Sequence, residues 1–277
     1  LVRDCVIVGN RVLSEEPFSV PAFAGGFHCG SGGELHSCVV AHNWSQGYVG
    51  GGTCAGLLEN CRIEDNHSEE IGGIALVTAG IARSCRIERN TATNYCGGVS
   101  LSDGALLQNS LVADNAAPSA AGVVFVHGES TLRNSTIVNN SANSCGGLLV
   151  GDLCTQAAVV NCIVADNAGG NVSNAVPVAV YSYSCSFPLL PGIGNIADAP
   201  QFVDASSGDY HLTALSPCID AGTTNAMPDR DLDGTPRPLD GDADGIAAVD
   251  IGAYEYDIPR AGTHYVSLQG GHVYPYT

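Results

Sequence analysis

A short pattern of small, apolar and polar positions recurs seven times in the first two-thirds of the chain. Cys or Ser lies five positions before an Asn, and Ile or Val lies three positions before it. The gaps between successive Asn residues are 33, 23, 24, 25, 25 and 27 positions, and the residues are Asn10, Asn43, Asn66, Asn90, Asn115, Asn140 and Asn167. A period in this range is typical of stacked structural repeats rather than of a single globular core.

Within each repeat the apolar positions alternate with a period of two, which predicts β-strands. The residues five and three positions before the Asn share one side of a strand, and we expect this small, apolar side to face inward. The positions four and two before the Asn then face outward. In two neighbouring repeats they are Arg62 with Glu64 and Arg86 with Glu88, which predicts a charged, solvated wall.

A second strand begins at a glycine pair in most repeats, as in Gly72-Gly73-Ile74-Ala75-Leu76. We expect the pair to form a tight corner that needs positive φ. A weaker third strand surrounds an apolar residue eight positions before the Asn, and no helical periodicity intervenes. The sequence therefore predicts an all-β chain that forms a right-handed parallel β-helix of about seven to eight coils of about 24 residues. Its Asn residues would stack as a ladder at a corner, where Asn tolerates the left-handed conformation.

The composition of the chain limits the classes of partner that it can bind. The net charge is −18, and all ten basic residues are Arg. Nucleic acid is excluded as a partner because nothing forms a basic patch to neutralise phosphates. No apolar run approaches the roughly 20 residues of a membrane span, so we expect no membrane insertion. Divalent cations are the natural partners of so acidic a surface.

The chain has twelve cysteines, most of them at repeat positions. We expect most to be buried free thiols that act as small apolar fillers, with disulfides between adjacent coils as the open alternative. A group of His and Cys in the second repeat superficially suggests zinc: His28, Cys29, His36, Cys38 and His42. It lacks a CxxC pair, and strand alternation sends its members to different faces, so we predict no metal there.

The character of the sequence changes at about residue 196. The run PQFVD…GDYHLTALSPCIDAG…DLDGTPRP…VDIGAYEY closely resembles the end of the choice-of-anchor Q domain, a family of exported bacterial β-helix proteins. The match covers about Asn195 to Tyr256, and the repeats upstream resemble, more weakly, those of polymorphic outer-membrane proteins. The resemblance implies an extracellular or cell-surface location and brings no established enzymatic activity with it.

Three parts follow from these patterns. Residues 1–195 form the β-helix, with an incomplete first coil, and residues 196–256 form a capping region. Residues 257–277 look like the opening strand of a further unit, which suggests copies of the chain, or neighbouring units, joined end to end. We expect the capping region to cover the open C-terminal coil, whose edge would otherwise promote aggregation, through Phe202, Tyr210, Leu212, Leu215 and Ile219.

The capping region also carries two runs of alternating carboxylates that close on a glycine. The first is Asp229, Asp231 and Asp233, and the second is Asp240, Asp242 and Asp244, followed by Asp250. This pattern is how short loops wrap oxygen ligands around calcium, so we predict a calcium site. The second run departs from the EF-hand loop because its next acid is at position eleven and is Asp rather than Glu. A solvated acidic turn is the alternative.

Three functions are compatible with these patterns. A non-enzymatic structural or adhesive surface module fits a stiff, charged rod best. A carbohydrate-binding surface would use the aromatic residues Trp44, Tyr48 and Tyr95. A polysaccharide lyase or hydrolase would need paired acids on one wall, with the candidates Glu64, Asp65, Glu88, Asp114 and Asp166. Three of these acids directly precede a repeat Asn, which indicates a corner feature rather than a catalytic pair.

Overall fold

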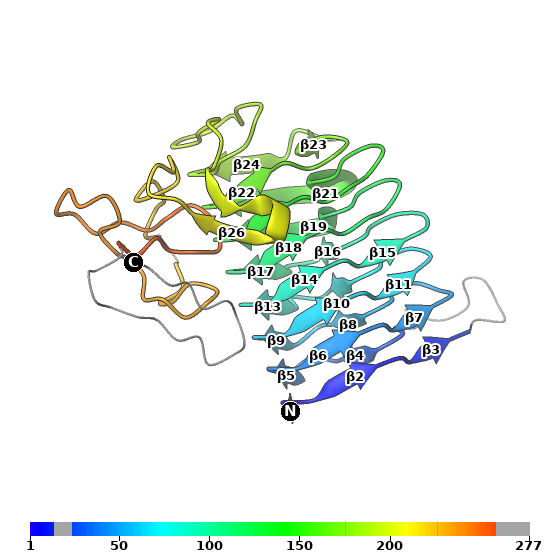
Figure 1. Cartoon of the computed structure of the whole chain (residues 1–277). Coiled ribbons are helices and arrows are strands. Elements are labelled where there is room, and N and C mark those ends of the chain that lie inside the picture. Colours follow the sequence, from blue (N-terminus) through cyan, green and yellow to red (C-terminus); the bar gives the residue numbers. More distant parts are fainter. Residues whose placement is uncertain (14–23, 175, 226, 259–277) are drawn as a thin grey trace.

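The computed structural model describes residues 1–13, 24–174, 176–225 and 227–258. The chain winds through stacked coils whose strands pair in parallel and in register (Figure 1). One wall is a seven-stranded sheet of β2 (Val6–Val8), β6 (Val39–Ala41), β10 (Arg62–Glu64), β14 (Arg86–Glu88), β18 (Leu111–Ala113), β20 (Thr136–Val138) and β22 (Ile163–Ala165). Seven coils therefore contribute to this wall, and the predicted parallel β-helix is confirmed.

The remaining coil strands form two further sheets. A four-stranded sheet contains β3 (Arg11–Val12), β7 (Trp44–Ser45), β11 (His67–Ser68) and β15 (Thr91–Ala92). The strands after the glycine pairs are β4 (Phe27–Cys29), β8 (Gly52–Cys54), β12 (Ile74–Leu76) and β16 (Val99–Ser102). The weaker third strands are β1 (Val2–Arg3), β5 (Glu34–His36), β9 (Leu57–Glu59), β13 (Ile81–Arg83) and β17 (Leu106–Gln108).

Two long strands join these last two sets into one thirteen-stranded sheet, because each runs through both: β19 (Val123–Arg133) and β21 (Leu148–Val160). The sheet is completed by β23 (Val172–Asn174) and β24 (Ala179–Ser182), which pair with β21. A separate hairpin follows, formed by β25 (Phe202–Asp204), the 3₁₀ turn η1 (Ala205–Ser207) and β26 (Asp209–Leu212).

The core is a set of apolar ladders. The residues three positions before each repeat Asn stack inward with almost no exposed surface from the second coil on: Val40, Ile63, Ile87, Val112, Ile137 and Val164. Eleven of the twelve cysteines are buried, and Cys5 in the first coil is exposed. The prediction that cysteines fill the core is confirmed for these eleven.

The repeat Asn residues form a continuous hydrogen-bonded ladder. In Asn90, for example, the side-chain amide donates to Asn115 Oδ1 at 3.0 Å and to the backbone oxygen of Ile63 at 2.8 Å. Its backbone N–H also donates to Asn115 Oδ1, at 2.9 Å. Each buried amide is thus satisfied by the coil above and the coil below.

The left-handed conformation that we expected of the ladder Asn belongs instead to the residue before it. Asp65, Arg89 and Asp114 have φ of 55°, 56° and 57°, whereas no repeat Asn from Asn10 to Asn167 has positive φ. The turn therefore precedes the ladder, and the Asn is selected for its amide rather than for its backbone freedom.

The glycine pairs are required for a reason other than the one predicted. They do not adopt positive φ. Instead the next coil passes so close that a Cβ on Gly98 would lie 2.4 Å from the backbone oxygen of Gly122, and one on Gly73 would lie 2.3 Å from that of Gly98. These contacts leave no space for a side chain.

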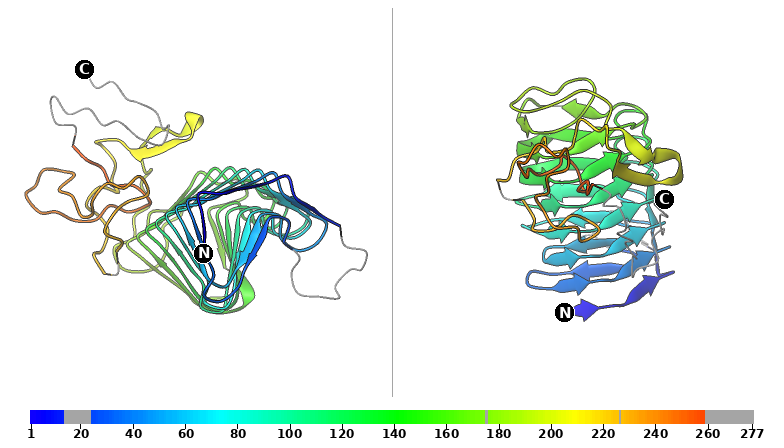
Figure 2. Two further views of the ribbon diagram at one scale, coloured as in Figure 1. Left: turned by 90° about the horizontal axis from the view of Figure 1, so that it is seen from below. Right: turned by 60° about the vertical axis from the view of Figure 1, so that its left-hand side comes forward.

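The predicted position of the capping region was wrong. Irregular closing coils, not the capping region, cover the C-terminal end of the core, through the buried residues Tyr181 and Leu190. The segment from about residue 200 to 256 lies outside the seven-stranded wall, along several coils (Figure 2). Leu215, expected to cover the end, is 86% exposed.

The physical reason lies in the outward side chains of the wall. They are charged in β10 and β14 but uncharged in β18, β20 and β22, where Leu111, Val138 and Ile163 are at most 1% exposed. The capping segment buries them with Tyr210, Leu212, Ile251 and Tyr254. It is fastened by N–H donors of Gly252 to Asn161 O at 2.9 Å and of Ala253 to Thr136 Oγ1 at 3.0 Å.

Candidate functional site

The capping segment is organised around a buried ionic network. The Arg237 and Glu255 side chains have no exposed surface, and Arg237 Nε lies 3.4 Å from Glu255 Oε2. Arg237 also donates to the Gly252 backbone oxygen at 3.0 Å. Burial raises the pKa of Glu255 to about 7, a rise that Arg237 opposes.

Asp250 belongs to this network and not to a cation loop. Its oxygens accept the backbone N–H groups of Asp220 at 2.7 Å and of Tyr256 at 2.6 Å. Burial, with Glu255 nearby, raises its pKa to about 8. The motif residues that resemble the choice-of-anchor Q family therefore hold the fold of the capping segment.

The first predicted calcium run is used for structure. Asp231 is buried, and its carboxylate accepts N–H groups of Asp233 at 3.0 Å, Thr235 at 2.7 Å and Glu255 at 2.9 Å. Asp233 forms an ion pair with Arg86 of the wall at 3.0 Å, and Asp229 is exposed. Within the part of the chain that the structure describes, these three carboxylates do not form a cation-sized group.

The second run contributes to a compact carboxylate group. One oxygen from each of Asp220, Asp240 and Asp242 lies within 4.8 Å of the others. Asp220 accepts the N–H groups of Gly241 at 2.9 Å and Asp242 at 2.8 Å, which pins the loop beneath it. Burial raises the pKa of Asp220.

A second feature of this carboxylate group also fits a hard cation: one of its oxygens is buried without a partner. Asp240 Oδ2 accepts the Gly245 N–H at 3.1 Å, but Asp240 Oδ1 is buried and has no hydrogen-bond partner. A buried, unpartnered carboxylate oxygen is costly, and calcium takes such oxygens as ligands. Asp244 is exposed and accepts the Ile246 N–H at 2.7 Å, outside the group.

Asp220 was missed by the sequence reasoning. It precedes the acidic run by 20 positions, in the segment SPCIDAG, and only the folded loop brings it close. The sequence signal was the acid itself, placed between the apolar Ile219 and Ala221 in a segment predicted to pack inward.

Two of the five candidate catalytic acids of the wall, Glu64 and Asp65, are held in close ion pairs. Glu64 Oε2 lies 2.7 Å from both Arg62 and Arg89, and Asp65 lies 3.2 Å from Arg89. Burial raises the pKa of Glu88, while the nearby arginines limit the rise. Asp114 accepts a hydrogen bond from Asn139, and Asp166 is exposed beside the last ladder positions.

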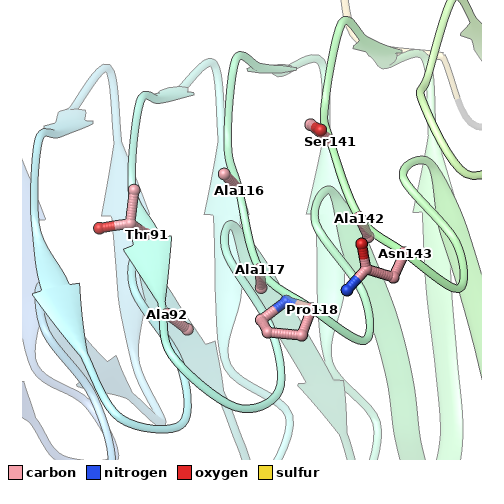
Figure 3. Close-up of a pocket in the computed structure, with 8 residues that line it drawn as sticks. All are labelled: Thr91, Ala92, Ala116, Ala117, Pro118, Ser141, Ala142 and Asn143. Carbon is pink, nitrogen blue, oxygen red and sulfur yellow. The ribbon is translucent and has the colours of Figure 1, made fainter.

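A shallow recess lies along the four-stranded side of the helix (Figure 3). Thr91, Ala116, Pro118, Ser141 and Asn143 are among the eight residues that line it, and none of the eight is ionisable or aromatic. The recess therefore offers neither an acid–base pair nor a stacking platform for a sugar.

The aromatic candidates for sugar binding are dispersed. The Arg11 guanidinium lies 4.6 Å above the Trp44 ring. Tyr95 packs against a small apolar cluster, and burial raises its pKa to about 12. Tyr48 is 43% exposed, so these residues do not form one open platform.

The expected lack of a zinc site in the second repeat stays a prediction, although its residues have other partners. His28 Nδ1 is 2.6 Å from Thr53 Oγ1, and His36 contacts Glu59 at 2.8 Å. Across the described ranges, no helix is long and apolar enough to cross a membrane.

Parallel coils, stacked Asn and inward aliphatic ladders define a parallel β-helix protein. A family model for a right handed beta helix region matches residues 2–142, and the chain belongs to this family. No curated protein matches the chain. Among solved structures, it is similar to the crystal structure of pectate lyase Pel9A, with 13% identity, a TM-score of 0.46, and coverage of 91% of this chain and 88% of that chain.

Proposed function

We propose that the chain is a non-enzymatic structural or adhesive β-helix module of an extracellular or cell-surface protein, which extends end to end. The observation that carries this proposal is the continuous stack of parallel, in-register coils, which the Asn ladder ties together into a stiff rod. Val6 is 68% exposed and Val8 is 51% exposed on β2, and exposed apolar strands of this kind accept further strands.

Two further features support a structural role. The acids of the charged wall are held by arginines, and the shallow recess carries no ionisable group. The motif run from Asn195 to Tyr256 resembles exported choice-of-anchor Q proteins, which favours a location outside the cell. The predicted tail, residues 257–277, lies outside the described residues from residue 259 on.

The test is the assembly state of the purified full chain, measured by sedimentation over a range of concentrations and by electron microscopy. We expect rods that lengthen with concentration. Lysines on β2, in a Val6→Lys and Val8→Lys double variant, should leave monomers because charged strands resist strand addition. Val203→Lys is the matched control, since Val203 is 46% exposed on the separate hairpin. Wild-type protein that stays monomeric at every concentration would refute end-to-end extension.

The alternatives have their own readouts. A glycan array detects a carbohydrate-binding surface, and sugar release from pectin- and alginate-like polymers detects a lyase or hydrolase. Activity in either assay, lost in an Asp65→Asn or Glu88→Gln variant, would replace the structural proposal.

We also propose calcium as the ligand of the Asp220, Asp240 and Asp242 group. Isothermal titration of the full chain with calcium chloride should show binding, and Asp240→Asn should weaken it at least tenfold because it removes the unpartnered charge. Asp152→Asn, an exposed acid on β21, is the control. An unchanged titration in Asp240→Asn would exclude this site.

A further inference from the structure

The cysteines of the coils behave as ladder members. Cys61 Sγ donates to the backbone oxygen two residues earlier, Glu59 O, at 3.3 Å. Ser110 and Ser135 make the same bond in later coils, to Gln108 O at 2.7 Å and to Arg133 O at 2.9 Å. Cys and Ser are thus interchangeable here, as short side chains that bond back to their own turn.

Ladder geometry disfavours disulfides between these cysteines. Cys29 pairs in register with Cys54, and the strands that follow Cys61 and Cys85 also pair in register. Neighbouring residues in a parallel sheet are held about 4.8 Å apart. A disulfide needs Cβ atoms about 3.8 Å apart with a twisted S–S bond, so closure would distort the stack.

Cys185 and Cys218, unlike the ladder cysteines, come from two different parts of the fold. Cys185 lies in a closing coil, where its N–H donates to Cys162 O at 2.8 Å and its Sγ donates to Asp198 O at 3.2 Å. Cys218 lies in the capping segment, where its carbonyl accepts the Ile251 N–H at 2.9 Å. Both are buried in one apolar cluster between wall and capping segment, with Ile163 and Leu212.

No strand pairing fixes the distance between these two residues. Cys185 bridges to Ile163 and Ile196, and Cys218 is in none of the described strands or bridges. The two thiols contact one another, and this contact together with burial raises the pKa of Cys218. Cys185 and Cys218 are therefore brought together by packing in one cluster and not by a shared ladder.

We propose that Cys185 and Cys218 form a disulfide that fastens the capping segment to the wall of the β-helix. The two thiols lose two protons and two electrons and form one S–S bond. A disulfide donor such as oxidised glutathione accepts them, and its own S–S bond breaks to give two thiols. The supply of such a donor rests on the extracellular location proposed above.

The test supplies the donor directly, so it is independent of location. The full chain is refolded with a mixture of oxidised and reduced glutathione, alkylated under denaturing conditions, and mapped by mass spectrometry. Trypsin alone cannot separate the pair, because no Lys or Arg lies between Arg133 and Arg230. Chymotrypsin, which cuts after Tyr183, Phe202 and Tyr210, should release two peptides joined through Cys185 and Cys218.

Stability gives a second readout. The link closes a loop between residues 33 positions apart, so reductant should lower the melting temperature of the oxidised protein by about 5–10 °C. Cys218→Ser should abolish this sensitivity to reductant. Cys162→Ser, a ladder position where Ser also occurs, should retain it.

Alkylation of both thiols in the oxidised protein would overturn the proposal, as would Cys185 or Cys218 joined to any other cysteine. The wild-type map decides this even if a variant fails to fold. If the refolded protein forms the disulfide but the protein is found inside the cell, only the proposed location is refuted.

Discussion

At the scale of single residues, two residue types define the coil: the ladder Asn and the glycine before each strand. The side-chain N–H groups of each ladder Asn donate to the preceding coil and to the following coil. Its side-chain oxygen accepts from the Asn of the preceding coil. The glycine before each strand is needed because the next coil leaves no space for a side chain. Neither role depends on unusual backbone conformation, because the positive φ of each corner is taken by the residue before the Asn.

Asn115→Ala should lower the free energy of unfolding by roughly 3–5 kcal/mol. It removes two donated bonds, to Ile87 O and Asn140 Oδ1, and leaves the buried Asn90 N–H without an acceptor. Each buried group left unsatisfied costs about 1–3 kcal/mol. Denaturant unfolding measures the change, and Asn143→Ala, at an exposed position, is the control. Equal stability of the two variants would contradict the ladder's role.

Gly98→Ala should destabilise the protein by about 1–3 kcal/mol, the usual cost of overpacking. The added methyl would lie 2.4 Å from the Gly122 oxygen, which is backbone and cannot rotate away. Thermal melting of Gly30→Ala provides the comparison, because a Cβ at Gly30 meets nothing within 4 Å. A similar melting temperature for both variants would rule out close approach as the reason for the glycine.

At the scale of elements, the outward side of the seven-stranded wall decides where the capping segment docks. Glu64, Glu88 and Ala113 occupy one register position in successive coils. The change from charge to Ala coincides with the start of the covered surface, since Ala113 has no exposed area. The capping segment therefore docks on the coils of β18, β20 and β22, beyond the charged outer face of β10 and β14.

Ala113→Glu should detach the capping segment at a cost of roughly 3 kcal/mol or more, because it buries an unpaired charge. Limited chymotrypsin digestion should then cut the segment from 200 to 256 rapidly while the coils persist. Val8→Glu occupies the same ladder position in the uncovered first coil, where Val8 is 51% exposed, and should leave the digestion pattern unchanged. Resistance equal to wild type in Ala113→Glu would contradict this docking.

His211 should make docking sensitive to pH. Burial alone would lower its pKa, but its bonds to Asp233 at 2.8 Å and Asp209 at 2.6 Å raise it overall. Tyr254 stacks on the ring at 4.2 Å, and Arg86 holds the same Asp233. A raised folded pKa gives stability that is complete below the unfolded pKa of about 6.5 and is lost as the pH rises through the folded value.

The expected loss is less than about 1 kcal/mol because the pair is partly solvated. The measurement is the difference in free energy of unfolding between wild type and His211→Gln from pH 5.5 to 9. The difference should shrink as the pH rises. A difference that grows with pH would reverse the sign and refute the ion pair.

At the scale of the whole molecule, the architecture was predictable from sequence because its determinants recur at fixed spacing. The Ile87 and Asn90 positions of one coil repeat in the next, so each local pattern is also a tertiary contact. The position of the capping segment was not predicted, although the outward residues Leu111, Val138 and Ile163 signalled a covered wall. Asp220 joins Asp240 and Asp242 only through the loop fold, which no periodicity encodes.

The capping segment contacts the wall at Arg86 in β14, at Thr136 in β20 and at Asn161 just before β22. These contacts tie several successive coils to one another from outside, as a splint does. In the described residues the coils of β2, β6 and β10 are joined by strand pairing, by the ladders and by ion pairs such as His36–Glu59. The rod therefore has a splinted half and a free half. Under tension or heat, fraying would start at the free half and stop at the splint, which would keep the C-terminal coils folded.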